Sequence, residues 1–358
     1  MKPKRQAAPS GAGNNSIPVC ADLKPPASED RILELLKRRF GRRSAGLVLG
    51  MGDDAAVIRT RAGEDWVITT DMLLEGVDFR EGWLTPAQLG HKALAVNLSD
   101  LAAMGARPRF YLVALGVPPS TAESWIVSFY RGMSALGERH RAVLLGGDLS
   151  RSAGGAQVTV TAIGVARRGR LLRRSGGKPG DWLYVTGVLG RSAAGLRLLL
   201  SRRLRGSTPR EREALRTHKM PLPRCAAGQW LAASGLVRAM MDLSDGLSAD
   251  LPRLCRASGT GAELHADRIP LFEAARHWGA SPLDLALNGG EDFELLFAVP
   301  ERAVEELRRT YPRRFPPIAA IGRLTRGSDI MVRSHAGARP RKLSAGGFDH
   351  FRTGINPP

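Results

Sequence analysis

Aspartates in this chain are concentrated in short segments that also contain glycine or small polar residues. The acidic segments are Gly52-Asp53-Asp54-Ala55, Thr69-Thr70-Asp71, Gly146-Gly147-Asp148, Asp242-Leu243-Ser244-Asp245-Gly246 and Gly289-Gly290-Glu291-Asp292. Carboxylates that converge in a fold repel one another and are costly to desolvate unless hard cations lie between them. No histidine or cysteine accompanies them, and sites made only of oxygen ligands favour Mg²⁺, which proteins usually bind together with a nucleotide's phosphates. The pattern therefore predicts a phosphoryl-transfer enzyme.

The element that the sequence specifies best is a helix expected from Pro86 to Met104. The segment Thr85-Pro86-Ala87-Gln88 offers an N-cap, a proline at the first helical position and a capping-box glutamine. Asn97 and Asp100 interrupt its apolar face, and because they are three residues apart they point the same way. Two interpretations stay open: a hydrogen-bond network to the backbone, or a metal or phosphate site.

Three further segments have compositions suited to ligand binding. The glycines of Gly146-Gly147-Asp148, expected at the end of a strand, would let a phosphate approach backbone N–H groups. Asp242 and Asp245 flank Ser244 in one turn, and the Gly-Gly-Glu-Asp segment lets a ligand with a cationic group approach a carboxylate closely. The sequence has no Walker-type loop and no protein-kinase motifs. We therefore expect metal ions to hold the nucleotide, with Arg174 on its phosphates.

Short strands and helices should position these segments. Strands are expected at 47–49, 55–59, 66–70, 110–117, 142–145, 158–165, 182–186, 239–243, 262–265, 293–299 and 318–322. Helices are expected from Ser28, from a capping box at 120–123, and at 192–204, 225–233, 248–257 and 301–311. The Arg-rich residues between 204 and 225 are expected to form an exposed linker. The first six strands should make a largely antiparallel sheet.

Length and composition indicate two domains behind a tail. At 358 residues the chain exceeds the size at which one core usually stops growing. We expect a disordered tail at 1–26, a first domain at 27–166 and a second at 167–358. The three cysteines have no metal-ligand spacing and fit a reduced, cytoplasmic setting, and no apolar run approaches the roughly 20 residues that span a bilayer.

Basic residues exceed acidic ones by 53 to 34, and the excess is uneven, because residues 167–224 contain 16 Lys or Arg against 3 Asp or Glu. Such a surface attracts anionic partners. No zinc finger, basic zipper or RNA-binding sheet pattern is present. We therefore do not expect nucleic acid to be the main partner.

Read in order, the motifs resemble those of the thiamine-monophosphate kinase family. The resemblance runs from about residue 29 to Phe351. Its most specific parts are the helix Lys92-Ala-Leu-Ala-Val-Asn-Leu-Ser-Asp-Leu-Ala-Ala-Met-Gly-Ala106 and the segment Gly289-Gly-Glu-Asp-Phe-Glu294. The Arg-rich stretch from Arg197 to Lys219 and the tail have no counterpart in it.

The resemblance implies a fold and an activity. The fold is the two-domain α+β fold shared with aminoimidazole ribonucleotide synthetase and selenophosphate synthetase. Its N-terminal mixed sheet with helices pairs into a barrel in a homodimer, and its C-terminal domain is sandwich-like. The activity is Mg²⁺-assisted transfer of the γ-phosphoryl group of ATP to thiamine monophosphate, giving thiamine diphosphate, by direct in-line displacement.

The resemblance also implies roles for individual residues. The Mg²⁺ ligands would be Asp54, Thr69, Thr70, Asp71, Asp100, Asp148, Asp242 and Asp245. Gly147, Asp148, Arg174 and Ser244 would contact ATP, and Asp54, Asp148, Asp245 and Arg174 would act in catalysis. Asp78, Glu291 and Phe348 would contact the substrate, although relatives often carry histidine where Asp78 stands. Two alternatives remain: an ATP-dependent ligase like aminoimidazole ribonucleotide synthetase, and a non-catalytic, basic RNA-binding relative.

Overall fold

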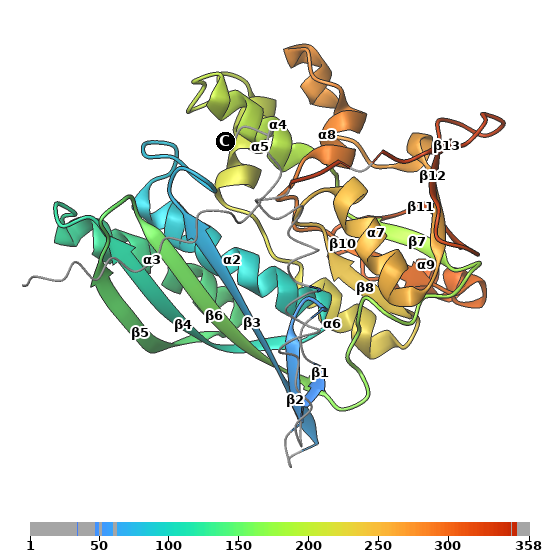
Figure 1. Cartoon of the computed structure of the whole chain (residues 1–358), viewed down its shortest axis with the longest axis horizontal. Coiled ribbons are helices and arrows are strands. Elements are labelled where there is room, and N and C mark those ends of the chain that lie inside the picture. Colours follow the sequence, from blue (N-terminus) through green and yellow to red (C-terminus); the bar gives the residue numbers. More distant parts are fainter. Residues whose placement is uncertain (1–33, 35–46, 50–51, 60–62, 345, 349–358) are drawn as a thin grey trace, which may run out of the picture.

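The computed structural model of the chain describes Glu34 and residues 47–49, 52–59, 63–344 and 346–348 (Figure 1). The expected tail and Cys20 lie outside these residues. Of the helix expected from Ser28, only Glu34 lies within them. Within them, two sheets and their covering helices form the two-domain α+β architecture that the sequence predicts.

The first sheet has six strands in the order β1-β2-β3-β6-β4-β5. Its strands are β1 (Leu47–Leu49), β2 (Ala56–Arg59), β3 (Glu64–Leu74), β4 (Arg107–Val117), β5 (Val143–Arg151) and β6 (Gln157–Arg167). Every pair is antiparallel except β4 with β5. This confirms the prediction of a largely antiparallel sheet. It is an open sheet within the single chain.

Helices α2 (Pro86–Ala103) and α3 (Glu123–His140) cover one face of this sheet (Figure 1). The predicted start of α2 is confirmed: the Thr85 hydroxyl accepts from the Gln88 N–H, and the Gln88 side chain accepts from the Thr85 N–H. Most of α2 is buried because α6 (Cys225–Ser234) and β8 (Ala239–Asp242) of the second domain pack on its other side. The helix therefore lies between the two domains.

The other face of the first sheet carries large apolar side chains. Trp66, Met72 and Leu112 alternate along β3 and β4 with core residues, so they point away from α2 and α3. They are 41%, 55% and 37% exposed. An apolar sheet face of this kind is uncommon in a monomer.

The second sheet has seven strands in the order β13-β12-β9-β11-β7-β10-β8. Its strands are β7 (Trp182–Thr186), β8 (Ala239–Asp242), β9 (Gly261–His265), β10 (Leu295–Val299), β11 (Ile318–Thr325), β12 (Ile330–Arg333) and β13 (Arg341–Lys342). Only β9 and β12 pair in parallel.

Helices cover both faces of the second sheet. The helices of this domain are α4 (Arg191–Leu200), α5 (Pro209–Lys219), α6 (Cys225–Ser234), α7 (Leu247–Ser258), α8 (Pro282–Asn288) and α9 (Val304–Thr310). Tyr184 on β7 packs in the cluster that contains α2, α6 and α9, whereas its neighbours Leu183 and Val185 pack with α7 and α8. This alternation makes the domain three-layered.

Two local predictions are wrong: the strand end at Gly146 and the capping box before α3. Gly146-Gly147-Asp148 lies inside β5, because the strand continues past the glycines to Arg151 and pairs with β4. Helix α3 begins at Glu123, and its N-cap residue Ala122 has no side chain that could accept a hydrogen bond, so the capping box expected at 120–123 does not form.

The predicted Arg-rich linker is also wrong. Most of it forms α5, which opens with a capping box between Thr208 and Glu211 and has Pro209 in its first turn. Helix α4 ends at Leu200, earlier than predicted, and Arg202 has a positive φ of 60°. None of the helices in the described part combines the length and apolarity needed to cross a bilayer.

Candidate active site

Three carboxylates converge where α2 meets both domains. Oxygen atoms of Asp54, Asp100 and Asp242 all lie within 4.8 Å of one another. They come from the turn before β2, from α2 and from the end of β8. We call these three residues the acidic cluster. Distant segments of the sequence therefore build one site, as the distribution of aspartates predicts.

The end of β3 contributes a hydroxyl and a fourth carboxylate. Thr69 Oγ1 donates to Asp100 Oδ2 at 2.5 Å. Asp71 points to the same side of the strand, and its pKa rises to about 6, because of burial and then because the negative charges of Asp245 and Asp78 are close, although a hydrogen bond with Asp100 opposes the rise. Asp71 is hydrogen-bonded to Asp100 and therefore lies beside the acidic cluster, with the charges of Asp78 and Asp245 close to it.

Burial and mutual repulsion disfavour the ionised forms of the cluster carboxylates. The pKa values of Asp100 and Asp242 are raised well above the usual value, first by burial and then by neighbouring aspartates. Ser99 partly offsets this for Asp242, because its hydroxyl donates to Asp242 Oδ2 at 2.6 Å. Asp54 Oδ2 is buried and has no hydrogen-bond partner among the described residues. An unsatisfied carboxylate oxygen amid carboxylates is what a hard cation requires.

Two arginines border the carboxylates. Arg174 donates to Asp54 Oδ1 through Nε at 3.1 Å and Nη2 at 2.6 Å, and its backbone N–H points to Asp53. Arg253 Nη1 binds both Asp245 and Asp250. Burial alone would lower the pKa of Arg174, but Asp54 and Asp53 raise it, so its charge is fixed. The site thus places a permanent cation against its metal-ligand candidates.

Glu291 lies in a buried ion pair. Its Oε1 is 2.7 Å from Lys92 Nζ on α2, and its Oε2 is 3.0 Å from His218 Nδ1 on α5. Burial opposes ionisation of Glu291, but Lys92 and then His218 outweigh it, and the pKa of Glu291 falls to about 2. Lys92 is fully buried, whereas the Glu291 side chain is 25% exposed. The Glu291 carboxylate therefore reaches the surface of the site with its negative charge balanced by Lys92.

Asp292 and Glu294, the other two acids of this segment, stabilise the fold of the second domain. Asp292 accepts from the N–H groups of Gly190 and Ser192 at the start of α4, at 2.6 and 3.0 Å. Glu294 accepts from Thr186 Oγ1 at 2.6 Å and from the Arg224 guanidinium. Only Glu291 of the three is left facing the site.

The two substrate-binding candidates of the second domain, Glu291 and Phe348, are both hydrogen-bonded to the turn at Ser244 and Asp245. The Glu291 N–H donates to the Ser244 carbonyl at 2.7 Å, and the Phe348 N–H donates to the Asp245 carbonyl at 3.1 Å. Asp78 approaches from the first domain, where its carboxylate accepts from the Leu74 N–H at 2.7 Å. The structure therefore brings these residues to the side of the acidic cluster.

Thr70 and the Gly147-Asp148 pair are not brought together with the cluster. Thr70 points to the open face of the sheet, where Oγ1 donates to the Val160 carbonyl at 3.1 Å. Asp71, Val160, Val113 and Gly147 form one row of partners across the sheet. Three strand spacings separate Asp71 from Gly147, about 14 Å. In a single chain Asp148 therefore lies on the outermost strand, away from the other acidic residues.

Sequence reasoning gave no role to several residues of the site, although three of them lie in motifs that it singled out. They are Asp53, Lys92, Ser99, His218, Asp250 and Arg253. A signal existed for Lys92, the only lysine in an otherwise largely apolar helix. Nothing local marks Ser99 or His218, because each acquires its partner from a distant part of the chain.

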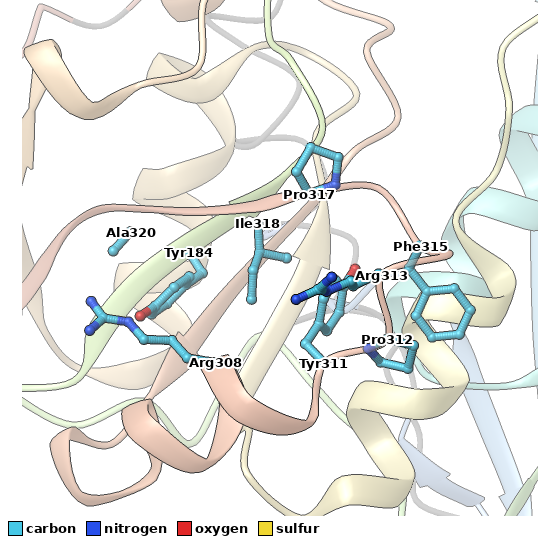
Figure 2. A pocket seen from close by; sticks show the side chains of 9 residues that line it. All are labelled: Tyr184, Arg308, Tyr311, Pro312, Arg313, Phe315, Pro317, Ile318 and Ala320. Atoms are coloured by element: carbon cyan, nitrogen blue, oxygen red, sulfur yellow. The ribbon is translucent and has the colours of Figure 1, made fainter.

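A cavity of about 490 Å³ lies elsewhere in the second domain (Figure 2). Tyr184 and Ile318 line its floor, with Arg308, Tyr311 and Phe315 around it. None of the predicted site residues contributes to its wall.

Both domains match one known group of proteins. Residues 52–166 match the family "AIR synthase related protein, N-terminal domain", and residues 178–334 match "AIR synthase related protein, C-terminal domain". The chain is 40% identical to the thiamine-monophosphate kinase of Escherichia coli K12, covering 89% of this chain and 98% of that protein. It is 36% identical to the thiamine-monophosphate kinase of Bacillus subtilis, covering 85% and 94%.

Solved structures of thiamine-monophosphate kinases have the same fold as this chain. The structure of "AaThiL complexed with AMPPCP and TMP" superimposes with a TM-score of 0.79 at 30% identity, covering 90% of this chain and 97% of that one. Thiamine-monophosphate kinase from Stenotrophomonas maltophilia gives a TM-score of 0.70 at 37% identity, covering 86% and 96%. The hydrogenase maturation protein HypE of Escherichia coli, at 17% identity and a TM-score of 0.65, shares the fold alone. The chain is thus a member of the thiamine-monophosphate kinase family, within the proteins related to AIR synthase.

Proposed function

We propose that this protein transfers the γ-phosphoryl group of ATP to thiamine monophosphate, giving thiamine diphosphate and ADP. One observation carries the proposal most directly: the oxygen atoms of Asp54, Asp100 and Asp242 converge within 4.8 Å. Such a cluster suits an enzyme that must hold two polyanionic substrates side by side. Relatives named for this activity match nearly the whole chain.

The residues fit Mg²⁺. The donor set consists of carboxylate and hydroxyl oxygens, burial and neighbouring carboxylates raise the pKa values of Asp100 and Asp242, and Asp54 Oδ2 is a buried acceptor without a partner in the described part. We assign Asp54, Asp71, Asp100, Asp242 and Asp245 as metal-holding residues. When bound, the ions neutralise the phosphates' mutual repulsion and fix their orientation. Thr69 positions Asp100. That Thr70 and Asp148 bind Mg²⁺ stays a prediction, which requires ligands from a second copy of the chain.

The chain's own residues have separate roles in the transfer. The phosphate of thiamine monophosphate is already ionised at neutral pH, so no general base is required, and transfer proceeds in line without a phosphorylated protein residue. Arg174 is fixed by Asp54 and offers its remaining N–H groups to the phosphates of ATP. Glu291 and Phe348 provide a carboxylate and an aromatic ring for the cationic heterocycle, with Asp78 on the opposite side. Catalysis then consists mainly of alignment and charge compensation.

We also propose that the protein is a homodimer joined through the open face of the first sheet. Trp66, Met72 and Leu112 supply an exposed apolar surface there. An interface that uses the same patch on both copies is the usual geometry of a two-fold dimer. Pairing two such sheets would bury this surface and form the barrel that the resemblance implies.

A single assay separates the alternatives. Purified full-length protein is incubated with ATP, Mg²⁺ and thiamine monophosphate, and thiamine diphosphate is quantified by chromatography. We expect product with wild type, a loss of at least a hundredfold with Asp100→Asn, and unchanged turnover with Asp329→Asn, whose carboxylate pairs with Lys342 on the surface. Absence of thiamine diphosphate with folded wild-type protein, or full turnover by Asp100→Asn, would refute the proposal.

A further inference from the structure

A second cavity of about 500 Å³ lies between the start of α2 and helix α5. One wall contains Trp83 and Gln88, and the opposite wall contains Arg205, Arg212, Arg216 and Lys219. No aspartate or glutamate lines it. We call it the basic cavity. It is built from the Arg-rich stretch that the family resemblance leaves unexplained.

The charges of the basic cavity lack carboxylate partners within the described residues. The side chains of Arg205 and Arg216 make no hydrogen bond or ion pair there, and the Arg212 guanidinium donates only to the Ser207 carbonyl, at 3.0 Å. The nearest acids on α5 are occupied. Glu211 accepts from Arg203 and from the turn before the helix, and Glu213 pairs with Arg191 and Arg210.

Lys219 provides the strongest sign that an anion belongs in the basic cavity. The residue is only 8% exposed, and its Nζ donates to the Leu204 carbonyl at 2.8 Å, with no carboxylate near it in the described chain. Burial lowers the pKa of this ammonium group. A buried cation without an anion is costly, so a negatively charged ligand would relieve an existing penalty at this position.

Helix α2 separates the basic cavity from the acidic cluster. Gln88 lines the cavity, Lys92 pairs with Glu291 one turn further along, and Asp100 belongs to the cluster. Twelve residues separate Gln88 from Asp100, which corresponds to about 18 Å along the helix axis. A ligand whose phosphate reaches the acidic cluster through Mg²⁺ therefore does not place that same phosphate in the basic cavity.

We propose that the basic cavity is a second anion site that binds a diphosphate or triphosphate group. Four cationic side chains around one cavity match the charge of such a group, whereas a single phosphate would leave most of them uncompensated. Trp83 belongs to the buried apolar cluster behind the cavity and already carries Arg80 over its ring at 5.2 Å, so the phosphate group is the part of the ligand that the cavity recognises. The assignment does not depend on the reaction proposed above.

The cavity of Figure 2 shows that an arginine at a cavity wall is not enough. Two arginines line it, but Arg308 is paired with Glu305 at 2.9 Å, and aromatic and aliphatic side chains make up much of the remaining wall. The Arg308 guanidinium also lies beside the buried Tyr184 hydroxyl (Figure 2). This second pair of arginines therefore supplies a control with the same change of charge.

The test is calorimetric titration of the full-length protein with inorganic tripolyphosphate in buffer free of divalent cations, where the acidic cluster repels polyanions. We expect wild type to bind, and Arg205→Ala/Arg216→Ala to bind at least tenfold more weakly. Arg308→Ala/Arg313→Ala should stay within twofold of wild type. Thermal unfolding confirms that each variant is folded, and Lys219→Met provides a further variant if the first does not fold.

Three outcomes would overturn the proposal: no binding by wild type, equal binding by Arg205→Ala/Arg216→Ala, or equal losses in both double variants, which would indicate only the general charge of the protein. Asp100→Asn should leave the affinity unchanged. A stronger affinity in that variant would place the ligand at the acidic cluster instead. Titrations with ATP and with pyrophosphate then distinguish the sources: equal affinity for ATP and inorganic tripolyphosphate would show that the cavity recognises the phosphates alone.

Discussion

Ser99 Oγ lies 2.6 Å from Asp242 Oδ2, and this hydrogen bond joins the helix of the first domain to the last residue of β8 in the second. The next residue of the helix, Asp100, places its carboxylate in the same acidic cluster. One turn of α2 therefore both supplies a ligand and orients another. The relative position of the two domains is in this way coupled to the geometry of the site.

Replacing Ser99 by alanine should weaken metal binding without unfolding the protein. The hydroxyl favours the ionised form of Asp242, and losing one hydrogen bond to a charged group costs about 1.5–3 kcal/mol. We expect the Mg²⁺ concentration for half-maximal activity to rise at least tenfold. Initial rates of thiamine diphosphate formation against Mg²⁺ concentration measure this. Ser201→Ala, which removes a surface hydrogen bond to Arg197, should leave the curve unchanged, and a similar shift in both variants would contradict the role of Ser99.

Metal binding should become stronger as the pH rises through 6. The pKa values of Asp53 and Asp71 are about 6, because both groups are buried among other carboxylates. A metal ion must displace the protons that these groups hold below that pH. We expect the apparent affinity for Mg²⁺ to rise about tenfold per pH unit between 5 and 6 for each proton displaced. Calorimetry in two buffers of different ionisation enthalpy counts the protons released, and Asp71→Asn should reduce that count.

The same pKa values predict an opposite trend in the stability of the metal-free protein. A carboxyl group whose pKa is about 6 in the folded state and 3.8 when unfolded stabilises the fold fully below 3.8, and this contribution is lost as the pH rises to 6. The difference in unfolding free energy between wild type and Asp71→Asn should therefore fall over this range. Urea unfolding in EDTA measures it. A difference that is constant with pH would show that the pKa of Asp71 is not raised in the folded protein.

Lys92→Met should leave the Glu291 charge without its main partner. Breaking a buried ion pair on one side costs about 3–5 kcal/mol, and the partial exposure of Glu291 favours the lower end of that range. We expect the pKa of Glu291 to rise and the KM for thiamine monophosphate to increase. Lys92→Met/Glu291→Gln should recover part of the lost stability but not the KM. Urea unfolding and steady-state kinetics test the two parts separately, and additive effects in the double variant would argue against the pairing.

Charge on the open face of the first sheet should prevent dimer formation. Met72 is 55% exposed on that face, whereas Val127 is 49% exposed on α3, on the opposite side. We expect Met72→Glu to shift the protein to monomer in sedimentation velocity experiments at micromolar concentration. Val127→Glu is the matched control and should leave the dimer intact. Monomeric wild type would remove the proposal altogether.

The sequence predicted the pieces of the site better than their arrangement. Thr85 and Gln88 specify the start of α2 through local hydrogen bonds, so this element could be predicted to the residue. The same pattern at Thr208 and Glu211 marks α5, but the density of arginine around it suggested a linker. His218 illustrates the limit, because its partner Glu291 is 73 positions away and only tertiary packing brings them together.

The interpretation of Gly146-Gly147-Asp148 failed for a related reason. Glycine is unfavourable inside a strand, so the sequence predicts that the strand ends before Gly146, yet here the glycines lie within it because the neighbouring strand leaves no room for a side chain. A Cβ atom at Gly147 would lie 1.8 Å from the Val113 carbonyl oxygen of β4. The need for glycine arises from strand packing, and no local pattern distinguishes it from the requirement of a turn.

Gly147→Ala should therefore destabilise the first domain. The added methyl group must push β5 away from β4, and overpacking of this kind typically costs about 1–3 kcal/mol. We expect the midpoint of urea unfolding to fall accordingly, and activity to fall further, because the movement displaces Asp148 on the same strand. Gly154→Ala is the matched control, since a Cβ there meets nothing within 4 Å, and it should unfold like wild type. If Gly147→Ala retained full stability, β5 could not be packed against β4 as the structure has it.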